Sequence, residues 1–104
     1  GNVAQAKIPG GEPGYQLRFA QAVKAATPQA NVMAVGMIFD PEQAEDIVAS
    51  GQADFIAIAR AALDDPHWAH HAAVALGEDE GLPVQYRGAA KGVWPAYDRA
   101  NTPA

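Results

Sequence analysis

The amino-acid sequence predicts an α/β fold built around two parallel strands that are joined by a helix. Two short apolar runs, residues 32–38 and 54–59, have the length and composition of strands that are buried on both faces. The segment between them carries the start and stop signals of a helix of about ten residues. A strand, a helix and a second strand in this order form a right-handed βαβ unit with parallel strands.

The other elements follow from local signals. Ahead of the first strand, apolar residues recur at helical spacing from Gly14 onward, and Thr27-Pro28 ends the pattern. The helix between the strands begins at Asp40, which is suited to an N-cap, continues with Pro41 at the first helical position, and ends before Gly51. These residues predict a helix before the first strand and a capped helix after it.

Beyond the second strand, residues 60–63 predict a short helical turn. Asp64-Asp65-Pro66 is expected to cap a further helix that carries Trp68 and ends at Gly77. From residue 78 onward the chain is polar and rich in Gly and Pro. We therefore expect residues 1–80 to form βα units and residues 81–104 to form a tail.

The composition indicates a chain that needs a companion. With 104 residues it has room for one small domain or for a part of a larger one, and Leu, Ile, Val and Phe make up about a fifth of it. Two parallel strands leave both sheet edges unpaired and both apolar faces to be covered. We expect the missing strands to come from sequence outside this chain or from other chains, and the isolated chain not to fold stably.

Several classes of protein are disfavoured. A net charge of −5 with only seven Lys and Arg leaves no basic patch for nucleic acid, and the lack of cysteine excludes disulfides and thiolate metal sites. No apolar run is long enough to span a membrane and no signal-peptide pattern is present, so we expect a cytoplasmic protein. His67, His70 and His71 share one helix without an HExxH pattern, so no metal site is expected.

Two residues stand where parallel α/β folds bind ligands. Gly36 lies at the carboxyl end of the first predicted strand, and Arg60 follows the second, where a helical turn opens. Glycine lets an anion approach backbone N–H groups, and arginine adds a bidentate positive fork, so the pair predicts a phosphate cradle. The alternative is structural: Gly36 only ends the strand tightly, and Arg60 pairs with an acid such as Asp40.

The stretch VMAVGMIFDPEQAEDIVASGQADFIAIARAALDDPHWAHHAA, residues 32–73, resembles the C-terminal end of the old yellow enzyme family. The shared pattern is a strand ending in Val-Gly, an Asp-Pro helix start with Gln-Ala-Glu, then Gly-x-Ala-Asp, an apolar strand ending in Arg, and Asp-Pro. The opening GNV, Pro13-Gly14-Tyr15-Gln16 and the tail motif Gln85-Tyr86-Arg87-Gly88 extend the resemblance over roughly residues 1–88, closest to the bacterial xenobiotic-reductase branch.

The resemblance implies a (β/α)₈ TIM barrel of which this chain supplies the last two βα units and the tail. It implies FMN as cofactor, with Gly36 and the pair Ala59-Arg60 holding the flavin phosphate. The implied reaction passes hydride from NAD(P)H through FMN to an activated alkene. The family's catalytic residues lie in the earlier units, so this chain holds none. A chain that begins at Gly1 is expected to be a piece of such an enzyme, inactive without the N-terminal remainder of the same barrel.

For the tail, the resemblance implies a contact with a neighbouring subunit in a homo-oligomer. In the bacterial branch an arginine of the tail motif reaches the neighbour's active site, and Arg87 is the matching residue, with Trp94 or Tyr97 as alternatives. Two other hypotheses remain open. In the first, the chain is a half-barrel module that binds a phosphate-bearing ligand without redox chemistry. In the second, it is an α/β chain without a functional site.

Overall fold

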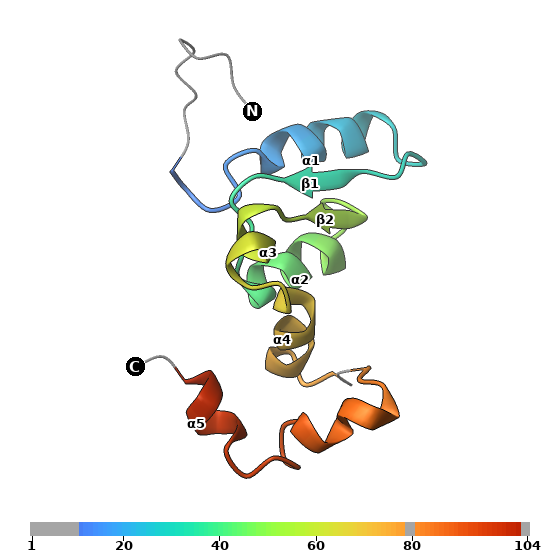
Figure 1. The fold of residues 1–104 in the computed structure, drawn as a ribbon. Coiled ribbons are helices and arrows are strands. Elements are labelled where there is room, and N and C mark those ends of the chain that lie inside the picture. Colours follow the sequence, from blue (N-terminus) through green and yellow to red (C-terminus); the bar gives the residue numbers. More distant parts are fainter. Residues whose placement is uncertain (1–10, 79–80, 103–104) are drawn as a thin grey trace. The chain divides into compact units, whose positions relative to one another are not determined.

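The computed structural model describes residues 11–78 and 81–102 (Figure 1). The chain forms two compact units, Gly1–Pro66 and His67–Ala104, and each is described here by itself. The opening GNV and the acidic pair at residues 79–80 lie outside the described residues. The predicted boundary between barrel units and tail, at residues 80–81, therefore stays a prediction.

The first unit is built on two parallel strands, β1 (Met33–Val35) and β2 (Phe55–Ala57), joined by α2 (Pro41–Ala49). The strands pair in the register Met33–Phe55, Ala34–Ile56 and Val35–Ala57. The predicted α/β arrangement with two parallel strands is therefore confirmed. Each strand has three residues and is shorter than its apolar run, because the backbone of β1 leaves the extended conformation at Gly36.

Two helices cover these strands. Helix α1 (Leu17–Ala26) packs beside β1, and α2 packs beside β2 (Figure 1). Small side chains at the contact let helices and strands approach closely. Ile47 is the largest fully buried side chain, and the rest of the buried set in this unit is Ala20, Val32, Ala34, Ile38, Ala44 and Ala53. The core is thus a thin, alanine-rich layer on the Ala34 face of the sheet.

The opposite face of the sheet is open. Met33 and Phe55, which are register partners, are 59% and 54% exposed, and Val35 on the same face is also exposed. The sequence predicts that the apolar runs need cover from outside this chain, and within residues 11–66 one face of the sheet has none. The physical reason is that within residues 11–66 the helices cover one face only.

The start of α2 agrees with its sequence signals. Asp40 is the N-cap, and its carboxylate Oδ1 accepts a hydrogen bond from the Glu42 N–H at 3.1 Å, with Pro41 at the first helical position. Gly51 follows the C-cap and has a positive φ of 77°, which glycine adopts without a steric penalty.

The expected cap of the later helix is wrong. Helix α3 (Arg60–Asp64) ends with one of the two aspartates, and α4 (Trp68–Ala75) begins with His67 at its N-cap and no side-chain cap. Asp64 is the last residue of α3, and Asp65 is its C-cap, whose N–H donates to the carbonyl of Ala61, so the two aspartates end α3 and the cap position of α4 falls on His67.

An ion pair ties the first helix to the sheet. The Lys24 ammonium donates to both carboxylate oxygens of Asp54, at 3.0 and 2.8 Å, and to the carbonyl of Ala30 at 3.0 Å. Asp54 Oδ2 also accepts from the Val32 N–H at 2.9 Å. These hydrogen bonds, chiefly the one from Lys24, lower the pKa of Asp54. One carboxylate therefore joins α1 to the amino-terminal ends of both strands.

The second unit is helical. After α4 it contains a 3₁₀ helix, η1 (Val84–Ala89), and a short helix, α5 (Tyr97–Asn101). Tyr97 is buried within it, whereas Val84, Tyr86 and Val93 are exposed. In the part of the chain that the structure describes, no helix is long and apolar enough to cross a membrane.

Candidate functional site

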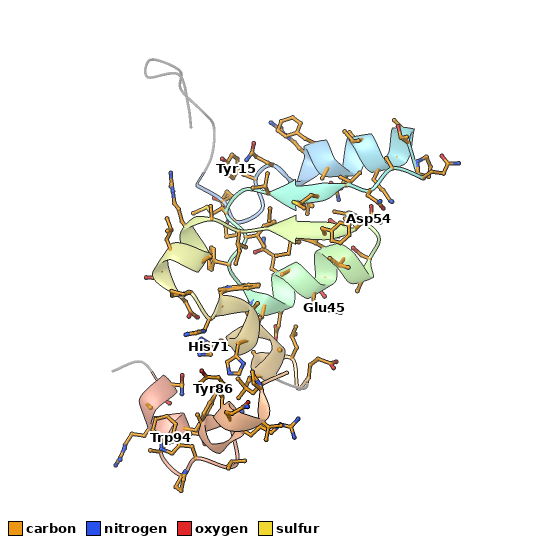
Figure 2. The ribbon with its side chains drawn as sticks, turned by 45° about the vertical axis from the view of Figure 1, so that its right-hand side comes forward. Tyr15, Glu45, Asp54, His71, Tyr86 and Trp94 are labelled. Carbon is orange, nitrogen blue, oxygen red and sulfur yellow. The ribbon has the colours of Figure 1, made fainter. Side chains whose placement is uncertain are left out.

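A hollow of about 700 Å³ lies at the carboxyl-terminal ends of β1 and β2. Three segments line it: the loop before α1, the turn after β1, and the junction of β2 with α3. All three residues predicted to form a phosphate cradle, Gly36, Ala59 and Arg60, are in its wall. Figure 2 shows Tyr15, which also lines it, and Asp54 at opposite ends of the two strands. The fold thus brings the predicted residues together at one end of the sheet.

The turn after β1 has an unusual backbone. Gly36 has a φ of +117° and Met37 has a φ of +54°, a left-handed conformation that side chains other than glycine seldom adopt. The Gly14 N–H donates to the carbonyl of Met37 at 3.1 Å. The Gln16 amide donates to the carbonyl of Val35 at 3.5 Å. Two hydrogen bonds from the loop before α1 therefore hold this turn.

The turn after β1 and the loop before α1 each have a glycine that packs closely against a glutamine side chain. A Cβ on Gly36 would lie 2.6 Å from Gln16 Nε2 and within 3.2 Å of two further carbons of that side chain. A Cβ on Gly14, whose φ is +71°, would lie 2.9 Å from Gln43 Nε2 on α2. Each glycine thus faces a glutamine from another segment. Among the described residues, Gln43 Oε1 is buried and accepts no hydrogen bond.

Arg60 is the first residue of α3 and the charged side chain in the wall of the hollow. It is exposed, and within residues 11–78 and 81–102 it takes part in no ion pair. The Asp40 carboxylate instead caps α2, so the alternative pairing with Arg60 is not formed. Because α3 has only five residues, the positive charge available to an anion comes from the guanidinium rather than from a helix dipole.

Sequence reasoning missed part of this wall. Tyr15 and Met37 line the hollow as well, and Gln16 braces its turn. Pro13-Gly14 indicates a turn before α1, but nothing in the sequence says that this loop reaches the end of β1, 20 residues later. The positive φ of Met37 has no sequence signal at all, since methionine rarely adopts it.

The tail candidates lie in the second unit. Arg87 is exposed on η1, and its Nε donates to the carbonyl of Leu82 at 3.5 Å. Trp94, labelled in Figure 2, is 42% exposed, whereas Tyr97 is 9% exposed. Of the two aromatic alternatives, Trp94 is the one with surface to offer a partner.

The three histidines of this unit form a ring cluster on and beside α4. The centroids of His70 and His71 are 5.5 Å apart, and those of His67 and His71 are 6.3 Å apart. The described residues contain no group of three or more His, Asp or Glu side chains arranged to hold a metal ion.

Comparison with known proteins decides the family. Residues 6–79, well over half of the chain, match the NADH:flavin oxidoreductase / NADH oxidase family. The chain belongs to this family. The match covers β1, β2 and the whole hollow between their carboxyl ends. It confirms the resemblance to the old yellow enzymes and relates the hollow to a family that works on flavin.

Relatives of this chain in the family include NADPH dehydrogenases. That of Bacillus subtilis (strain 168) is 45% identical over 74 residues, which are 71% of this chain and 22% of the relative. That of Geobacillus sp. (strain WCH70) is 41% identical over 76 residues, again 71% and 22%. That of Halalkalibacterium halodurans is 41% identical over 88 residues, 83% of this chain and 25% of the relative. The chain thus spans about a quarter or less of the relatives it matches.

Proposed function

We propose that this chain is the last two βα units and the tail of a (β/α)₈ barrel that uses FMN and NAD(P)H to reduce activated alkenes. Its own task in that enzyme is to hold the flavin phosphate with Gly36, Ala59 and Arg60. The observation that carries the proposal is that these residues line one hollow at the carboxyl ends of two parallel strands. Parallel α/β barrels bind phosphate groups at this end of their strands.

The open sheet face supports the barrel. Met33, Val35 and Phe55 expose a contiguous apolar surface on strands whose outer edges pair with no other strand among the described residues. Parallel sheets are normally covered on both faces, so this surface calls for further strands and the side chains of a barrel interior. We assign that role to the N-terminal remainder of the same barrel, since the matched relatives are at least four times as long as the part they share with this chain.

The residues of the hollow fit a phosphate monoester. The Arg60 guanidinium has donors in a planar fork that matches two phosphate oxygens, and its charge is not used by another group within the described residues. Gly36 and Ala59 line the hollow with backbone and at most a methyl group, so a phosphate can come close to the main chain there. Gly36, Ala59 and Arg60 would hold the phosphate of FMN, which would supply hydride-transfer chemistry between NAD(P)H and the alkene. The groups that orient the alkene and deliver its proton would come from the preceding units, so the isolated chain is expected to be inactive.

The tail is proposed to dock on a second copy of the enzyme. Arg87 is the residue we assign to the neighbour's substrate region, with Trp94 as the second candidate. Both are exposed in the second unit, and aromatic and arginine side chains are enriched at protein interfaces. The enzyme would then be a homo-oligomer.

A chimera tests the flavin site. This chain would replace the matching segment of the Bacillus subtilis NADPH dehydrogenase, and the deflavinated chimera would be titrated with FMN and with riboflavin. We expect Arg60→Ala to weaken FMN binding by about 1.5–3 kcal/mol and to leave riboflavin binding nearly unchanged, since riboflavin lacks the phosphate. Arg18→Ala, which removes an exposed arginine stacked on Phe19 of α1, is the matched control. Unchanged FMN affinity in Arg60→Ala would refute the assignment.

The same chimera separates the enzyme from the phosphate-binding module. Turnover of NADPH with an enone such as cyclohexenone is expected for the chimera and not for the 104-residue chain. Tight FMN binding by the isolated chain, together with a chimera that binds FMN but transfers no hydride, would favour the module.

The tail is tested by comparing arginines. Arg87→Ala should raise the KM for the alkene while Arg99→Ala, on α5, leaves it unchanged. Deletion of residues 83–104 should also reduce the molecular mass in solution by dissociating the oligomer. Normal kinetics and an unchanged mass after the deletion would remove the tail from the mechanism.

A further inference from the structure

The side chain of Gln16 is committed to the turn after β1 rather than to its own helix. Gln16 is the N-cap residue of α1, yet its side chain makes no capping hydrogen bond. Its amide crosses to the end of β1 and donates to the carbonyl of Val35 at 3.5 Å. The position of a helix N-cap is usually held by a side chain that satisfies the first helical N–H groups. Here the side chain serves a strand end 19 residues further along the chain.

This strand end needs support. Gly36 and Met37 both have positive φ, and a non-glycine residue in that conformation stores strain that surrounding contacts must hold. The Gln16 side chain packs over Gly36 so closely that a Cβ there would meet its Nε2, Cγ and Cβ at 2.6, 3.1 and 3.2 Å. On the next residue, the carbonyl of Met37 is fixed by the Gly14 N–H at 3.1 Å. The loop before α1 therefore holds the turn at its carbonyls and at its Cα surface.

We propose that Gln16 is a positioning residue of the phosphate site. By holding the turn at residues 35–37 in its left-handed conformation, it presents the backbone of Gly36 and Met37 to a phosphate monoester that Arg60 also binds. The inference rests on the proposed function, because it takes the hollow to be the site of the flavin phosphate. It adds a third segment, the loop before α1, to the two strand ends.

The test compares two flavins in the deflavinated chimera. Gln16→Ala should weaken FMN binding about three- to tenfold, the loss expected for one net hydrogen bond, with riboflavin binding almost unchanged. Gln16→Glu keeps the size of the side chain but loses the donor to the Val35 carbonyl. It should likewise lower the affinity for FMN relative to the affinity for riboflavin. Gln21→Ala is the matched control, because Gln21 lies on the same helix and its amide bonds to Gln52 at 2.8 Å, away from the hollow. It should leave both affinities unchanged.

A second measurement tests the contact itself. Gly36→Ala should cost more FMN affinity when Gln16 is present than in the Gln16→Ala background, since that background removes the two closest contacts of the added methyl group, with Nε2 and Cγ of Gln16. Equal losses in the two backgrounds would overturn the positioning role. So would a Gln16→Ala variant whose FMN and riboflavin affinities fall by the same factor, or do not fall.

The role of Gln16 and the phosphate site itself can be refuted independently. If Arg60→Ala changes the FMN-to-riboflavin ratio and Gln16→Ala does not, only the role of Gln16 is refuted. If neither substitution changes that ratio, the hollow is not the phosphate site and the proposed function is refuted with it.

Discussion

The Lys24 ammonium lies 2.8 Å from the Asp54 carboxylate, and this one pair connects α1 to the amino-terminal ends of both strands. Asp54 also accepts from the Val32 N–H, just ahead of β1, while Asp54 itself stands just ahead of β2. The carboxylate therefore fixes where the two strands begin relative to each other. Because each strand has only three residues, that register also fixes where Gly36 and Arg60 meet at the other end.

The pair makes stability depend on pH in the acid range. The hydrogen bonds from Lys24 and Val32 lower the folded-state pKa of Asp54, so its contribution is complete above the ordinary pKa of an aspartate and is lost as the pH falls through the folded-state value. We expect Asp54→Asn to lower the urea midpoint of the chimera at neutral pH and to flatten its decline toward acid. Asp46→Asn, at an exposed site on α2, is the control. An acid decline as steep in Asp54→Asn as in the unsubstituted protein would contradict this.

Three glycines should respond differently to a methyl group. Gly36→Ala meets both a positive φ and the Gln16 side chain, and is expected to destabilise the chimera by about 1–3 kcal/mol. Gly51→Ala has the positive φ but open space, so its loss should be smaller. Gly88→Ala has neither and should be nearly neutral. Urea denaturation measures all three, and a different order would show that the turn relaxes around the new side chain.

The thin core concentrates its stability in one aliphatic side chain. Ile47 is the largest fully buried residue of the described chain, on the face of α2 that packs against β2. Ile47→Ala should cost about 2–5 kcal/mol, the range for large-to-small changes in cores. Leu63→Ala, at a site that is 83% exposed, removes no side chain from this core and should cost almost nothing. A large loss for Leu63→Ala in the chimera would identify it as a contact with the rest of the barrel.

The N-cap of α2 gives a local test. Asp40→Ala removes the acceptor of the Glu42 N–H and should destabilise the chimera by about 1 kcal/mol, while Asp40→Asn, which retains an acceptor, should lose less. Thermal unfolding compares the two. Since Asp40 does not pair with Arg60, FMN affinity should be the same in both variants. A drop in FMN affinity for Asp40→Ala would mean that the cap also shapes the hollow.

Local signals made the βαβ unit predictable. Asp40, Pro41 and Gly51 each act through their own backbone or nearest neighbours, so their roles follow from residue type. The position of Gly36 and Arg60 at the ends of two parallel strands follows from the order of the elements. The phosphate cradle could also be predicted as a hypothesis from the order of the elements, because parallel strands bring their carboxyl ends to one edge of the sheet.

The remainder depends on contacts between distant segments. Gln16 and Gly36 meet only because α1 packs beside β1, and neither residue type signals that contact. The sequence also could not say that the uncovered face is the one that carries Met33 and Phe55, since an apolar run does not show which of its faces the helices of the same chain cover. The misplaced cap at Asp64-Asp65 had a different cause: these residues end α3, so α4 begins two residues later, with His67 at its N-cap.

The two methionines of the chain can report on two different events, the covering of the open sheet face and the filling of the hollow. The chain has two methionines, and both lie on or beside β1: Met33 on the open face and Met37 in the wall of the hollow. A thioether is oxidised to a sulfoxide at a rate that follows its exposure. Brief peroxide treatment read by peptide mass spectrometry would therefore report, at Met33, whether companion strands have covered the sheet. At Met37 it would report whether a ligand occupies the hollow, without a label and in a single sample.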